Sequence, residues 1–65
     1  QKVNDEVERR LMADPDMEDM FPDVSKRRSV VIVSVEDAIS NPGRKDITKV
    51  DGLFARAKEL AEARA

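Results

Sequence analysis

The side chains best suited to chemistry are the acids of a short stretch that reads DPDMEDMFPDVS. Asp14, Asp16 and Glu18 alternate as the first ligands of an EF-hand calcium loop do. The later positions do not continue that pattern, because Asp19 stands where the loop needs glycine and Ser25 stands where it needs glutamate. We therefore expect these acids to form a solvated loop that binds no metal.

Catalytic groups are scarce in the rest of the chain. The sequence contains no His and no Cys, which removes the commonest acid–base group, the usual activator of a serine nucleophile, thiolate metal ligands and disulfides. Carboxylates are numerous, but none lies in the apolar sequence context that would tune it for acid–base work. The single turn at Gly43 does not form a phosphate-binding loop. The sequence predicts a protein that is not an enzyme and needs no cofactor.

A basic cluster of Lys26, Arg27 and Arg28 precedes the most apolar run of the chain and could contact nucleic-acid phosphates. A basic strand followed by two helices is similar in layout to the ribbon-helix-helix arrangement, in which two copies lay paired strands in the major groove. Base reading needs polar side chains, whereas both faces of this ribbon would be largely apolar. A small dimeric DNA-binding regulator or antitoxin is therefore the alternative hypothesis.

Size and composition predict one small domain of marginal stability, residues 1–65. A chain of this length buries only about 60% of its extended surface, and 40% of its residues are charged while only two are aromatic. The chain is acidic, with a net charge of −2 and a pI near 5.0. Residues 1–25 carry eight acids and three bases, whereas residues 26–65 carry six acids and nine bases. We expect a partner or self-association to supply part of the stability.

Membrane and export signals are not visible in the sequence. The longest apolar run, Val30 to Val33, is far shorter than the roughly 20 residues of a membrane span. No signal peptide is recognisable, and the lack of cysteine fits a cytoplasmic protein. We expect a cytoplasmic location and no contact with a membrane.

The N-terminal part is predicted to be a helix followed by a loop. Residues 1–13 contain a narrow apolar stripe at four-residue spacing, with Asn4 as a good N-cap and with Pro15 shortly after its end. We therefore place an N-terminal helix within 1–13 and an acidic loop at 14–25. The apolar side chains of that loop could lie on the body of the domain as a lid.

The strongest helical pattern covers residues 47–64, with Asp46 as its N-cap. Its apolar stripe consists of Ile47, Val50, Leu53, Phe54, Ala57, Leu60 and Ala61. Gly52 lowers the helix propensity by about 1 kcal/mol relative to alanine, which can reflect a close backbone approach or have no significance. This amphipathic helix could be an ordinary core helix or could dock on a partner.

The segment 28–33 could be a strand or part of a helix. Its β-branched residues favour a strand. A continuous helix would place its bases at the positive end and Glu36 and Asp37 toward the negative end, at a cost of about 0.3–1 kcal/mol each. A break at Ser34 removes this conflict, because Ser34 then caps a new helix. We predict a strand at 28–33 and a short helix at 35–41.

These elements predict a small α+β fold with the order helix, strand, short helix, helix, and residues 26–65 as its body. The alternative is an all-α three-helix domain. A lone strand leaves its backbone groups unpaired, so a second copy or a larger partner must complete it. We expect a protein–protein interaction or oligomerisation module, a homodimer or accessory subunit. Its interface would comprise Val30, Val31, Ile32, Val33, Ile47, Val50, Leu53, Phe54, Ala57 and Leu60.

Overall fold

Every regular element is a helix in the computed structural model, which describes residues 2–44 and 46–65. The four helices are α1 (Lys2–Ala13), α2 (Pro15–Met20), α3 (Val24–Ser40) and α4 (Val50–Glu62). No strand occurs in these described residues. The predicted α+β fold, with a strand at 28–33 and a short helix at 35–41, is therefore wrong. The all-α alternative agrees with the structure in class, but it predicted three helices where the described residues form four.

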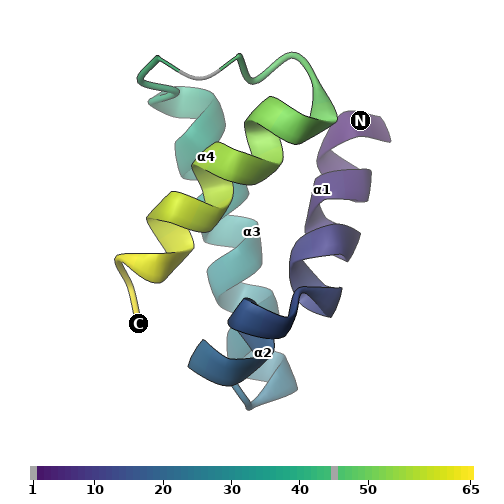
Figure 1. Cartoon of the computed structure of the whole chain (residues 1–65), viewed down its shortest axis with the longest axis vertical. Helices are drawn as coiled ribbons and strands as arrows, with labels where there is room; N and C mark the ends of the chain where they lie inside the picture. The colour runs from purple at the N-terminus through teal and green to yellow at the C-terminus, as the bar shows by residue number, and fades with distance from the viewer. Residues whose placement is uncertain (1, 45) are drawn as a thin grey trace.

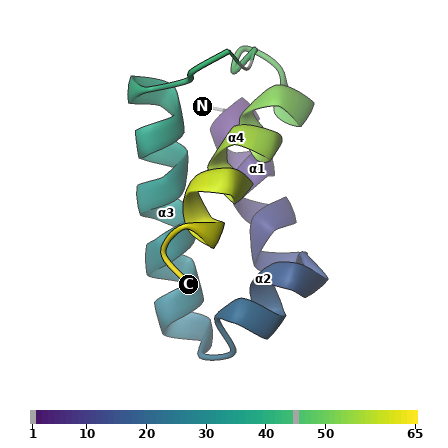
Figure 2. The ribbon, with the colours of Figure 1, turned by 60° about the vertical axis from the view of Figure 1, so that its left-hand side comes forward.

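The helices pack around α3, which is the longest (Figure 1). Figure 2 shows α3 along one side of the molecule, with α1, α2 and α4 all on its other side. The largest helix–helix contact joins α3 to α4, and α1 packs against both. The core between them consists of Val7, Leu11, Met17, Phe21, Val31, Val35, Ala38, Leu53, Ala57 and Ala61.

The start of α3 overcomes its adverse charges through local hydrogen bonds. The Asp23 carboxylate caps the helix by accepting from the backbone N–H groups of Ser25, at 2.9 Å, and Lys26, at 3.3 Å. Arg27 turns inward, where its Nε donates to the carbonyl oxygen of Phe21 at 2.8 Å and its Nη2 donates to that of Pro22 at 3.1 Å. One of the three bases expected to repel the helix dipole therefore ties α3 to the preceding turn.

Burial explains why α3 continues as a helix past Ser34. A strand would place Val31 and Val33 on the same face, but Val31 is 1% exposed and Val33 is 38% exposed. The helical period instead buries Val31, Val35 and Ala38 together. Each fully buried valine contributes about 1.5–3 kcal/mol, which exceeds a dipole penalty of about 0.3–1 kcal/mol per charge.

Ser34 lies inside α3 and does not cap a helix. Its side chain is fully buried, and its hydroxyl has no hydrogen-bond partner among the residues that the structure describes. Small side chains are buried on the facing helix too, at Ala57 and Ala61 of α4. Small buried side chains on both helices permit a close approach of α3 and α4, which make the largest helix–helix contact. An unsatisfied hydroxyl costs about 1–3 kcal/mol, and the burial around it exceeds that cost.

The segment 14–25 contains a helix, so the prediction of an acidic loop is wrong. α1 ends at Ala13, in agreement with the position of Pro15, and Pro15 then opens α2 as its first residue. The Asp14 carboxylate caps α2 by accepting from the backbone N–H of Met17 at 3.3 Å. Met17 and Phe21 belong to the core and Met20 packs against it, whereas Val24 is exposed, so only part of the expected lid is buried.

α4 begins at Val50, three residues later than the predicted start at Ile47. The Asp46 carboxylate accepts instead from the backbone N–H of Thr48, at 3.0 Å, and from its hydroxyl, at 2.6 Å. This local turn uses the carboxylate that was expected to cap the helix. The turn also explains Gly52, because a Cβ there would lie 1.6 Å from the backbone oxygen of Asp46.

Replacing Gly52 with alanine should lower stability, although alanine is the better helix former. Helix propensity alone favours Gly52→Ala by about 1 kcal/mol. The overlap with the Asp46 carbonyl must be relieved by moving backbone, so we expect a net loss of about 1–3 kcal/mol in urea unfolding. Glu62→Ala on the exposed side of α4 is the control and should change stability by less than about 0.5 kcal/mol. Unchanged or increased stability of Gly52→Ala would contradict the close approach.

Candidate docking surface on α3

The basic cluster predicted to contact nucleic acid is divided by α3. Lys26 and Arg28 are exposed, whereas Arg27 is only 8% exposed and its guanidinium is engaged with backbone carbonyls. The ribbon that would lay this cluster in a major groove does not form, because 28–33 belongs to α3. The ribbon-helix-helix layout is therefore absent from the described residues.

The apolar residues predicted to form a partner interface have two different positions. The predicted interface residues of α4 and of the turn before it face the core rather than solvent. Val30 and Val31 of α3 do the same. Val31, Leu53 and Ala57 are buried, and Val30, Ile47, Val50, Phe54 and Leu60 are partly buried against the core. Ile32 and Val33 are exposed on α3. The structure thus leaves α3, and not α4, with apolar surface open to a partner.

α3 carries the large apolar side chains that are most exposed among the described residues. Val24 is 60% exposed, Ile39 42%, Ile32 39% and Val33 38%. Figure 2 shows α1, α2 and α4 on one side of α3. Ile32 and Ile39 lie near that side, because each also lines a groove with α1. Sequence reasoning included Ile32 and Val33 but missed Val24 and Ile39. Their distribution along the helix would have indicated a solvent-facing surface only if the segment had been read as one continuous helix.

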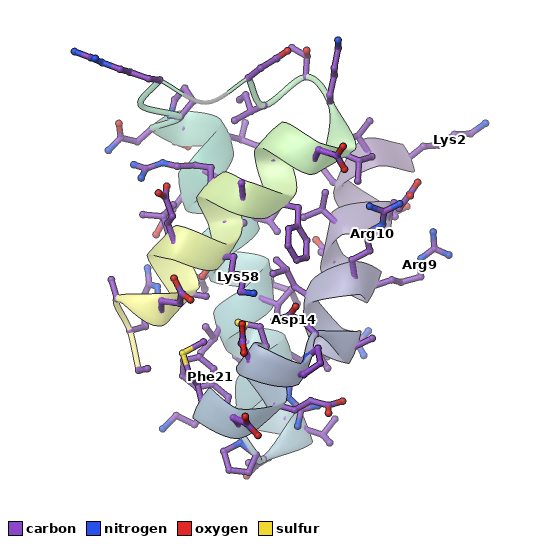
Figure 3. All side chains as sticks on the ribbon, in the orientation of Figure 1. Lys2, Arg9, Arg10, Asp14, Phe21 and Lys58 are labelled. Atoms are coloured by element: carbon purple, nitrogen blue, oxygen red, sulfur yellow. The ribbon has the colours of Figure 1, made fainter. Side chains whose placement is uncertain are left out.

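An open groove of about 950 Å³ lies between α1 and α3, beside this surface. Its apolar lining includes Met12 of α1 and Val31 and Ile32 of α3. Figure 3 shows Lys2 and Arg9 projecting from α1 away from the core. The charged residues that line the groove are Lys2, Asp5, Glu6, Glu8, Arg9, Glu18 and Arg28. The groove therefore combines apolar side chains with charged side chains of both signs.

Two acids of segment 14–25, Asp14 and Asp16, form a cluster with Lys58 of α4. The Nζ of Lys58 lies 2.9 Å from an oxygen of Asp16 and 3.1 Å from one of Asp14, and Figure 3 shows Lys58 and Asp14 pointing toward each other. Hydrogen bonds to Asp16 and then Asp14 raise the pKa of Lys58 above its usual value. Nζ also lies 5.8 Å from the centre of the Phe54 ring. This cluster attaches α4 to the start of α2.

The two carboxylates of this cluster are paired with an ammonium group and do not form a cation site. The part of the chain that the structure describes contains no group of three or more His, Cys, Asp or Glu side chains placed to hold a metal ion. Nor does any helix in it combine the length and apolar character needed to cross a bilayer.

Replacing Lys58 with methionine should lower stability at neutral pH, with a dependence on pH that identifies the ion pairs. Because the pKa of Lys58 is raised in the folded state, its ion pairs contribute their full stabilisation of the fold below the unfolded lysine pKa near 10.5. That stabilisation is lost as pH rises through the pKa of Lys58 in the folded state. The difference in urea midpoint between wild type and Lys58→Met should therefore become smaller as pH rises above the folded-state pKa of Lys58.

The matched control is Lys26→Met on exposed α3, since Lys26 has no ion-pair partner among the described residues. Its effect on the midpoint should be small, with little change across the same pH range. If the Lys58→Met difference stayed constant at high pH, the lysine would stabilise the fold through its packing and not through its charge.

Comparisons of the chain with known family models, curated proteins and solved structures find no match.

Proposed function

We propose that this chain is a non-catalytic protein–protein interaction module that docks through the outer face of α3. The observation that carries the proposal is the exposure of Val24, Ile32, Val33 and Ile39 on a helix whose other apolar side chains, Val31, Val35 and Ala38, are buried in the core. A rigid helix with an apolar outer surface is a common element of helix-to-helix recognition. Its docking requires no rearrangement of the fold.

The lining of the neighbouring groove supports association rather than reaction. The groove presents methionine, alanine, valine, isoleucine and charged side chains, without a hydroxyl or a histidine among its lining residues. Such a surface can exclude water at its centre and form ion pairs at its rim, which is the usual composition of a protein interface. The apolar side chains would supply affinity, and the mixed charges would select the orientation of the partner.

The proposed surface can be tested by site-specific photo-crosslinking of the folded protein in the cells that produce it. A benzophenone amino acid in place of Val33 should give a discrete protein adduct, whether with another copy or with a different protein. The same group in place of Glu62, which is exposed on α4, should give several-fold less. Adding Ile32→Glu to the Val33 probe should remove the adduct, because it places a charge at the centre of the surface.

Equal adduct yields at positions 33 and 62 would contradict the proposal. So would an adduct that persists with Ile32→Glu in place, since contact would then not depend on the apolar surface. Circular dichroism of the variants separates either result from loss of the fold, because the helical signal should remain.

A further inference from the structure

We infer that the partner of this surface is a second copy of the chain, with the two α3 helices packed antiparallel about Ile32. The inference rests on the proposed function and identifies the occupant of the same surface. It depends on the order of side chains along one ridge of the helix. The ridge consists of Val24, Arg28, Ile32, Glu36 and Ser40, all of them exposed.

The spacing of the ridge fits the commonest mode of helix packing. Residues four apart form a continuous row on a helix surface, and two such rows interdigitate when helices cross at about −50°. Ile32 is the middle residue of the row and the only large apolar side chain between its ends. It would therefore meet its own counterpart at the two-fold axis of a symmetric pair.

The charges on the ridge are complementary only when the second helix runs in the opposite direction. Arg28 and Glu36 lie four residues before and after Ile32, or about 6 Å along the helix axis on each side. In an antiparallel pair, Arg28 of each chain faces Glu36 of the other. A parallel pair would place arginine opposite arginine and glutamate opposite glutamate. The pattern thus specifies both the partner and its orientation.

Arg28 and Glu36 are also unpaired among the residues that the structure describes. Neither has an ion-pair partner among the described residues. Their neighbours differ: Arg27 bonds to two carbonyls, and Asp37 accepts from Arg64 at 2.6 Å. Arg28 and Glu36 are the charges that an antiparallel second copy would pair.

The row of residues beside the ridge has side chains small enough for a second helix to pack against it. Ser25 and Ser29 are small and exposed, and Val33 continues the row. The Ser29 hydroxyl donates to the backbone oxygen of Ser25 at 3.2 Å, so it can be covered without losing that hydrogen bond. The ridge of one copy can therefore enter the shallow groove between the two rows of the other.

A single helix crossing makes a small interface, so the dimer should be weak. Interfaces below about 1,200 Å² are typical of transient complexes. We expect dissociation constants of about 10–100 µM, with part of the affinity lost in high salt because the rim charges are screened. The monomer mass is 7.3 kDa, so a change of mass with concentration is readily measured by sedimentation equilibrium.

The deciding experiment compares charge reversals on the whole chain by sedimentation equilibrium between about 10 µM and 1 mM, at low salt. Wild type should approach twice the monomer mass. Arg28→Glu and Glu36→Arg should each weaken the dimer about tenfold, because each change places two like-charged pairs across the interface. The double variant carrying both reversals should return to near wild-type affinity, since the ion pairs re-form with opposite sense.

A weaker dimer in these variants should not result from loss of the fold, because both single reversals place charge in the sense that the helix dipole favours. Lys26→Glu is the matched control: it makes the same charge change on an exposed residue outside the ridge, and it should alter the dimer less than about twofold. A wild-type chain that remains a monomer at the highest concentration would overturn the second copy as the occupant. A dimer that the double variant fails to restore would overturn the antiparallel register.

Failure of the homodimer is distinguishable from failure of the proposed function. If sedimentation shows only monomer while the Val33 photo-probe forms an Ile32-dependent adduct with a different protein, the docking surface remains and its occupant is not a second copy. If sedimentation shows only monomer and the probe forms no such adduct, both the second copy and the docking surface are rejected.

Discussion

The Arg27 side chain reaches back from the first turn of α3 and donates to the carbonyl oxygens of Phe21 and Pro22. This contact orients the junction between α2 and α3 and stabilises two carbonyls at the end of the earlier segment. Asp23 completes the junction by capping α3. With the helix begun in this orientation, its 3.6-residue period carries Val31 and Val35 into the core. The positions of α1 and α4 follow, since both pack against α3.

The same helix gives the molecule two unequal faces. The inner face is apolar with small residues where α4 approaches, and it accounts for much of the core. The outer face keeps apolar side chains in solvent, of which Ile32 is central. It also carries two charges that have no ion-pair partner among the described residues. A small domain has little spare stability, so exposed charges that no contact among the described residues pairs are informative. In this chain Arg28 and Glu36 meet that description.

Sequence reasoning recovered the parts of the fold that local signals determine. Pro15 indicated the end of α1, and the apolar period indicated α4. The segment of α3 was predicted wrongly because its β-branched run, its dipole and the capping pattern at Ser34 all favoured a break. The interactions that decide otherwise are tertiary: burial of Val31 and Val35, and the inward turn of Arg27. The docking surface was only partly predicted for the same reason, since residues that face outward on a helix were assigned to a strand.

The most direct test of this account is a measurement of backbone Cα chemical shifts for residues 28–34 by nuclear magnetic resonance. The segment is helical in the structure, and both the core and the proposed docking face require it to be so. Downfield Cα shifts from random-coil values, continuous through Ser34, are the predicted result. Upfield shifts over 28–33 with a change of sign at Ser34 would show a strand followed by a new helix. That result would contradict the fold and, with it, the ridge on which the dimer depends.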